Sequence, residues 1–315
     1  MTMISSNWGG CKAVAAALLL GTTSVATAGL ASLALVPAPA SAQEAGTANI
    51  NISPRRVIFT PNERTAAVYV FNQGSAPVLV DVSLVDNVML PDGEIVAVET
   101  GARRDTPEFA TAAQRLRSAK ELLLATPSRL SIPPGEGRTV RLRASMPEDG
   151  TAREWRTHLT VATVPSRTTG LTAERAADLE PGELSFLVET TFGISIPLIV
   201  RNGAPDGSAR FGTIALGEAS AADQANGVAA VLTVPVGRTG EKSLYGNVEV
   251  RAGAGRNAEL LGVARGIGVY AEQDERLVRI PLTRKPAAGE ALTIRFSDEE
   301  AGAEKLLLTD TYVAP

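Results

Sequence analysis

The amino-acid sequence predicts an all-β protein with one short helical insert. Glycine and proline are plentiful, at 29 and 19 of 315 residues, while aromatic residues make up 4%; this composition is typical of short strands joined by turns. Apolar side chains alternate with period two in most segments, and only one segment shows helical spacing. With 44% hydrophobic residues, the chain can form two ordinary domains, each with its own core.

Residues 1–42 predict a secretory signal peptide. Lys12 precedes a long apolar run at 13–36, and the small residues Ala40 and Ala42 form the pattern that a signal peptidase cleaves. Because the run is long enough to span a bilayer, an uncleaved membrane anchor is the alternative. Cleavage after Ala42 removes the one cysteine, Cys11, and leaves no later stretch of membrane length. We therefore expect an exported, thiol-free chain that is not inserted in a membrane.

Residues 48–203 predict a first β-domain. Alternating apolar side chains predict strands near 50–58, 66–71, 78–84, 138–143 and 155–161, because this period marks a strand with one buried face. The turn residues Asn72-Gln-Gly74 and Pro91-Asp-Gly93 lie between strands. A polar stretch at 166–183 predicts a long loop. The longest alternation of the chain follows, from residue 184 to residue 200.

One segment of this domain predicts a helix, at 107–122. Thr106 is a suitable N-cap, and Pro107 and Glu108 suit the first helical turn. Apolar residues then recur near helical spacing, and basic residues gather toward the end. Because the apolar stripe is short, an insert that covers the core is favoured over a membrane-binding or partner-binding helix.

Residues 208–315 predict a second β-sandwich. The turn-rich segment 201–207 resembles a domain junction. Short apolar segments separated by turns then predict about seven strands, near 211–216, 229–236, 244–251, 259–270, 276–282, 290–296 and 305–313.

Composition excludes several kinds of function. A net charge of −4 argues against a basic nucleic-acid-binding protein. One cysteine and one histidine exclude a Cys/His zinc site and a disulfide framework, although carboxylates alone can still bind a hard cation. The histidine, His158, is expected on a solvated strand face. No nucleophile or phosphate-loop motif is present, so we predict no catalytic residues, no metal and no cofactor.

Four stretches of the first domain resemble the periplasmic chaperones of the chaperone–usher pilus-assembly pathway. Arg56-Val-Ile-Phe59 is similar to the first strand of that family. The others are the proline-rich stretch 125–135 followed by Val140-Arg-Leu142, the pair Arg153-Glu154 before Trp155, and the strand ending Ile196-Pro-Leu-Ile-Val-Arg201. Their order and spacing support the resemblance, which covers most of 48–203; the second domain matches only as a β-rich domain of suitable size.

The resemblance implies two immunoglobulin-like domains set as a boomerang, and a strand that is lent to a client. In that family the chaperone fills the groove of a pilus subunit with its own strand, through main-chain hydrogen bonds and alternate apolar side chains. The resemblance places the donated residues at Val188, Thr190 and Phe192, with Leu184 and Phe186 as extensions. The pattern alone is equally that of a strand facing its own core.

The resemblance also implies an anchor for the carboxylate at the client's C-terminus. Arg56 matches the arginine of the family's anchor, but Pro197 stands where the family has a lysine. Either another base such as Arg55 completes the anchor, or the anchor is weak or absent. The resemblance further implies an ion network between the domains, formed by Glu154, Arg201 and Asp298, that fixes the interdomain angle.

The implied function is that of a non-enzymatic periplasmic chaperone. It would bind exported pilus or surface-fibre subunits by donor-strand complementation and deliver them to an outer-membrane usher. The alternative is an exported immunoglobulin-like structural or adhesive component of a surface assembly. A β-sandwich hydrolase is a third and weaker candidate.

Overall fold

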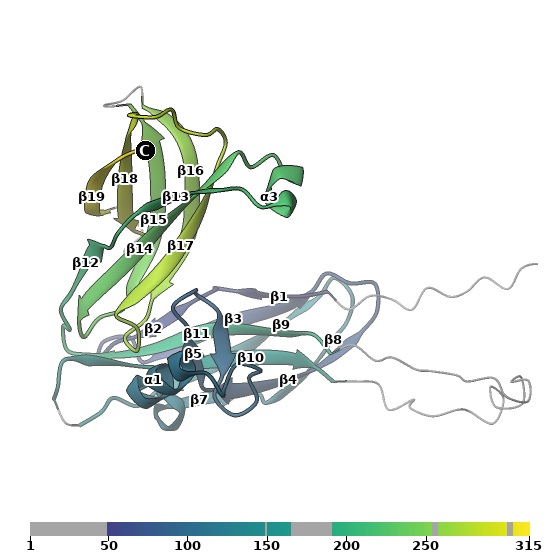
Figure 1. Cartoon of the computed structure of the whole chain (residues 1–315). Coiled ribbons are helices and arrows are strands. Elements are labelled where there is room, and N and C mark those ends of the chain that lie inside the picture. Colours follow the sequence, from purple (N-terminus) through teal and green to yellow (C-terminus); the bar gives the residue numbers. More distant parts are fainter. Residues whose placement is uncertain (1–48, 149, 165–190, 254–257, 301–304) are drawn as a thin grey trace, which may run out of the picture. The chain divides into compact units, whose positions relative to one another are not determined.

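The computed structural model describes residues 49–148, 150–164, 191–253, 258–300 and 305–315 (Figure 1). Residues 45–315 form one compact unit. The described chain consists mainly of strands, which confirms the predicted all-β class with a short helical insert. No helix among these residues is long and apolar enough to span a bilayer. The predicted signal peptide and the predicted loop at 166–183 lie outside the described residues.

The first β-sandwich packs a four-stranded sheet against a five-stranded sheet. The first sheet has the order β1 (Ile50–Ser53), β3 (Thr65–Asn72), β9 (Gly137–Ala144), β7 (Leu123–Thr126). The second sheet has the order β2 (Val57–Phe59), β11 (Gly193–Asn202), β10 (Arg153–Thr163), β4 (Val78–Val85), β8 (Arg129–Ile132). Alternate residues of these strands meet in one core, which includes Phe59, Leu142, Leu159 and Leu198, as the period-two pattern predicts.

The insert between β4 and β7 is a small structure with its own apolar cluster. It contains the hairpin of β5 (Asn87–Met89) and β6 (Ile95–Ala97), the helix α1 (Pro107–Arg115) and a 3₁₀ turn at Lys120–Leu122. Its cluster consists of Val88, Leu90, Val96, Phe109 and Ala112. Figure 1 labels β5 and α1 beside each other.

The helix begins where the sequence predicts and ends earlier. The hydroxyl of Thr106 accepts a hydrogen bond from the backbone N–H of Phe109 (3.3 Å), so the predicted N-cap is confirmed. The predicted end at residue 122 is wrong, because the helix stops at Arg115. The chain beyond it hydrogen-bonds to the start of β10 instead: the backbone N–H of Arg156 donates to the carbonyl of Arg117 (2.8 Å).

The second β-sandwich contains the strands predicted for residues 208–315. One sheet is formed by β12 (Gly207–Phe211), β13 (Ala215–Glu218), β14 (Ala230–Gly240) and β17 (Glu275–Leu282). The other has the order β16 (Glu259–Val269), β15 (Leu244–Ala252), β18 (Ala291–Asp298), β19 (Lys305–Val313). The strand predicted near 211–216 is two strands, and the short helix α3 (Ala221–Ala225) was not predicted.

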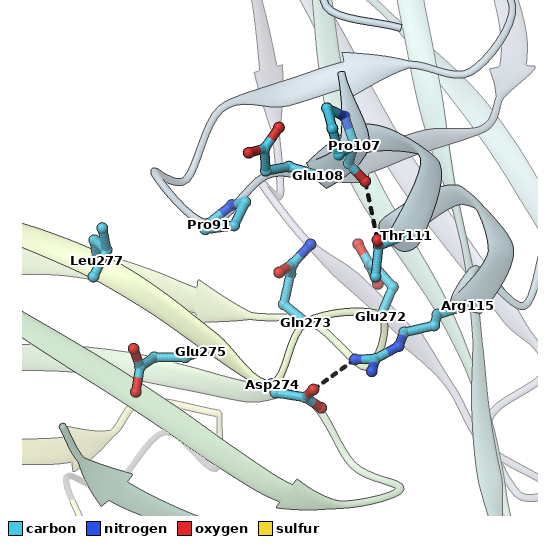
Figure 2. Close-up of a pocket in the computed structure, with 10 residues that line it drawn as sticks. All are labelled: Pro91, Pro107, Glu108, Thr111, Arg115, Glu272, Gln273, Asp274, Glu275 and Leu277. Atoms are coloured by element: carbon cyan, nitrogen blue, oxygen red, sulfur yellow. Dashed lines mark hydrogen bonds and ion pairs between the residues drawn. The ribbon is translucent and has the colours of Figure 1, made fainter. Parts of the chain in front are cut away.

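The strands of the first sandwich end at Asn202, and those of the second begin at Gly207. The two-domain division at this junction stays a prediction, since residues 45–315 form one compact unit. The insert joins the two sandwiches through backbone groups. The N–H of Leu277 donates to the carbonyl of Pro91 (2.7 Å), and the side chain of Gln273 donates to the carbonyl of Met89 (2.6 Å). Figure 2 shows this junction, where a cavity of about 500 Å³ separates α1 from the second sandwich.

Candidate functional site

Part of β11 has an open edge. On one side β11 pairs with β10 along its whole length, from Gly193 to Asn202. On the other side β2 pairs only with residues 198–200. Among the described strands, residues 193–197 therefore have a partner on one side only. An exposed strand edge of this kind is a template for pairing with another chain.

The register of β11 decides which backbone groups face this edge. The N–H of Thr163 donates to the carbonyl of Phe192 (2.8 Å), so even-numbered residues point their backbone groups toward β10. Those of Gly193, Ser195 and Pro197 point toward the open edge. Because proline has no N–H, the edge lacks one donor at Pro197. A complementing strand therefore has better hydrogen-bond partners on the N-terminal side of Pro197.

The side chains of β11 alternate as the sequence predicts. Ile196 is buried in the core, and Ile194 packs against it. Phe192, next on the same face, is 55% exposed. An exposed phenylalanine at the end of an open-edged strand is a candidate contact for a partner. The other predicted donated residues, Leu184, Phe186, Val188 and Thr190, lie outside the described residues.

Arg56 lies beside the open edge and is almost completely buried. Val57 of β2 pairs with Leu198, so the preceding residue, Arg56, is next to Pro197. The Arg56 side chain is 9% exposed and forms an ion pair with Glu300 (2.8 Å). Its guanidinium lies 4.7 Å from the centre of the Tyr245 ring. Its Nε and Nη1 atoms are buried and have no hydrogen-bond partner among the described residues. The neighbouring Arg55 is exposed.

Glu300 connects Arg56 to an ion network that includes two of the predicted members. One of its oxygens pairs with Arg56, and the other pairs with Arg201 (3.0 Å) and Lys242 (3.0 Å). Burial opposes the charge of Glu300, but hydrogen bonds from Arg201 and the charges of Arg56 and Arg201 outweigh burial and lower its pKa to about 2. Arg201 also donates to Glu154 (2.7 Å).

The third member of the network differs from the prediction. Among the described residues Glu300, and not Asp298, is the carboxylate of the second sandwich that contacts Arg201. Asp298 is the last residue of β18, and its side chain accepts a hydrogen bond from the backbone N–H of Glu300 (2.7 Å). It therefore orients the turn that carries Glu300. Glu154 also accepts from the backbone N–H of Ser243 (2.8 Å).

A second buried polar cluster has no counterpart among the predicted sites. Arg156 pairs with Glu272, donates to the carbonyl of Asn87 (2.9 Å), and lies 4.0 Å from the centre of the Tyr270 ring. The expectation of a solvated His158 is wrong, since His158 is 2% exposed and contacts Arg156. Burial, and then the charge of Arg156, lower the His158 pKa well below its usual value.

The sequence feature that could have indicated this cluster is the alternation of Arg156 and His158 with core residues in β10. That pattern places both side chains on the outer face of the sheet. The pattern does not show that the insert covers this face, because the contacts between the insert and β10 join residues that are far apart in the sequence. No group of three or more His, Cys, Asp or Glu residues in the described part of the chain is placed to hold a metal ion.

No protein-family model and no curated protein sequence matches the chain. The chain is similar to solved structures that contain chaperones. The YadV chaperone has a TM-score of 0.41 and 14% identity, and the match covers 84% of this chain and 99% of that one. The Pseudomonas aeruginosa CupB2 chaperone has a TM-score of 0.39 and 15% identity, with 84% and 100% covered.

The third structure is the CsuC–CsuE chaperone–tip adhesion subunit complex from the Csu pili of Acinetobacter baumannii. It has a TM-score of 0.42 and 15% identity, and the match covers 83% of this chain and 97% of that one. At these identities the likeness concerns the fold.

Proposed function

We propose that this protein is an exported, non-enzymatic chaperone that binds pilus-type subunits by lending them the open edge of β11. The observation that carries the proposal is the one-sided pairing of residues 193–197, which continues toward the exposed Phe192. A client strand would add to this edge through main-chain hydrogen bonds, and apolar side chains of the lent strand would fill the client's groove. The sequence resemblance supports the same function and the periplasmic location.

Arg56 is the proposed anchor for the client's terminal carboxylate. It lies where the open edge meets β2, and two of its guanidinium nitrogens are buried without a partner among the described residues. Buried N–H donors favour a ligand that can accept hydrogen bonds. Because Pro197 provides no cation, Lys242 of the Glu300 network is the second base in reach of this region. Amidation of the client's last carboxylate should therefore weaken the complex.

We assign the proposed delivery to an usher to the outer face of the four-stranded sheet of the first sandwich, which is formed by β1, β3, β9 and β7. Arg141 and Arg143 project from its outer face and have no ion-pair partner among the described residues. Both arginines line a shallow cavity of about 520 Å³ on this face. Leu124, which is 63% exposed, lines the same cavity. The outward positions of its four strands hold no carboxylate. This face suits a partner surface with acidic and apolar groups.

The test is to express the tagged chain together with its fibre subunits and to isolate it from the periplasm. The chain should co-purify with a small subunit, and Phe192→Glu should lower the recovered subunit at least about tenfold. An unpaired carboxylate buried in an apolar groove costs more than the roughly 1.4 kcal/mol that corresponds to a factor of ten. Leu306→Glu, at another exposed apolar site that lies on β19, is the matched control and should keep the subunit.

The outcomes of this experiment, and of one further variant, test the parts of the proposal separately. Recovery of the chain within the assembled fibre supports the structural or adhesive alternative. An unchanged subunit yield in Phe192→Glu contradicts binding through this strand. Leu124→Glu should keep the subunit and lower the amount of chain recovered with outer membranes, and unchanged recovery contradicts the usher surface.

A further inference from the structure

A cavity of about 580 Å³ lies on the outer face of the five-stranded sheet, beside the open edge of β11. Its floor is formed by residues of β10 and β11, namely His158, Thr160, Ser195 and Pro197. Ile95 of the β5–β6 hairpin and Tyr270 of the second sandwich form part of its walls. Cavities of this size hold small ligands and large side chains.

The cavity exists because the outward side chains of β11 are short at this point. Ser195 pairs across the sheet with Thr160, and their two hydroxyl groups share a hydrogen bond. Pro197 lies opposite His158 across the sheet. The ring of His158 contacts Arg156. A long side chain at position 195 or 197 would fill the space above the sheet.

The lining is uncharged and has both apolar and hydrogen-bonding groups. Val85, Ile95 and Ala97 provide apolar surface, and Asn87, Thr100 and Tyr270 provide polar groups. The nearby cation of Arg156 does not line the cavity; it pairs with Glu272 and donates to the carbonyl of Asn87. A charged group that entered this cavity would lose hydration without gaining a counter-charge. An aromatic side chain with a polar tip has the complementary chemistry.

The cavity is continuous with the strand edge, because Ser195 and Pro197 belong to both. A strand that pairs with this edge places every second side chain on the same face of the sheet as Ser195. We propose that the cavity receives an uncharged aromatic side chain, of the tyrosine type, from the client strand that pairs with β11. This inference rests on the proposed function and adds to it a determinant of client choice.

Capped peptides of about seven residues test the cavity separately from any natural client. They alternate threonine and valine and differ only at the central residue, which is tyrosine, lysine or glutamate. Binding to the chain without its predicted signal peptide, residues 43–315, is measured by calorimetry. The tyrosine peptide should bind at least about tenfold more tightly than the other two, a difference that this method resolves.

Two variants locate the preference. Ser195→Phe fills the floor from the exposed face of β11 and should remove the preference for tyrosine while the edge still binds all the peptides weakly. Thr139→Phe makes the same change at an exposed position on the other sheet and should leave the preference intact. Circular dichroism of both variants checks that they fold.

The outcomes separate this inference from the proposed function. Equal binding of all the peptides to the unchanged chain overturns the cavity and leaves pairing at the edge intact. A tyrosine preference that survives in Ser195→Phe also overturns the cavity. Absence of binding by every peptide overturns edge pairing, and the cavity with it.

Discussion

Glu300 is the carboxylate on which the side chains of Arg56, Arg201 and Lys242 converge. Arg201 lies between Glu300 and Glu154, and both carboxylates are nearly buried. Arg201→Ala would leave two carboxylates without their shared cation. It should lower the free energy of unfolding by about 3–5 kcal/mol, as expected when a buried ion pair loses one partner. Urea unfolding at neutral pH measures this change.

The control for Arg201 is an arginine in an exposed ion pair. Arg210 pairs with Glu275, and its side chain is 51% exposed. Arg210→Ala should change the free energy of unfolding by no more than about 1 kcal/mol. Equal effects of the two substitutions would show that the buried network does not stabilise the fold.

His158 predicts how stability depends on pH. Its folded-state pKa is well below the ordinary value of 6.5, because it is buried and faces Arg156. Below pH 6.5 the unfolded chain therefore binds a proton that the folded chain does not bind. Stability should fall as the pH drops below 6.5, with a slope that approaches about 1.4 kcal/mol per pH unit toward pH 5. His158→Gln should remove this slope, and a slope that persists in the variant would assign it to other groups.

At the level of elements, the sequence predicted the strands better than it predicted which segments lie beside them in space. The alternation in β9, with Val140 and Leu142 inward and Arg141 outward, is local and was found correctly. The end of α1 was not, because the chain after Arg115 hydrogen-bonds to β10, a partner distant in sequence. The open edge of β11 likewise follows from how far β2 extends along it.

The candidate site divides in the same way. Glu154 and Arg201 are paired across β10 and β11, so two short motifs were enough to bring them together. The choice of Glu300 over Asp298 depends on a turn after β18, and the acidic run at 298–300 gives no periodic signal for it. The cavity above Ser195 requires the insert, the sheet and the second sandwich together, which no local pattern predicts.

At the scale of the molecule, the insert links the two sandwiches. Met89, Ile199 and Tyr270 form a buried apolar cluster that draws on the insert, β11 and the second sandwich. Glu272, which is 2% exposed, accepts from the backbone N–H of Met89 (3.1 Å) and pairs with Arg156. Figure 2 shows a more exposed link, the ion pair of Arg115 with Asp274 (2.6 Å). These contacts should make the two sandwiches unfold together.

Two spectroscopic signals test this coupling. Trp155, the one tryptophan beyond the predicted signal peptide, packs against the first core, so its fluorescence reports on the first sandwich, while circular dichroism reports on both. Their urea transitions should coincide in the unchanged chain. Glu272→Ala leaves Arg156 buried without its carboxylate and should separate them. The control Glu275→Ala removes a carboxylate at the same junction that pairs with Arg210, a half-exposed arginine of the second sandwich, and should not. Separate transitions in the unchanged chain would show that the contacts are too weak to couple the sandwiches, and coincident transitions in Glu272→Ala would place the coupling in the apolar cluster.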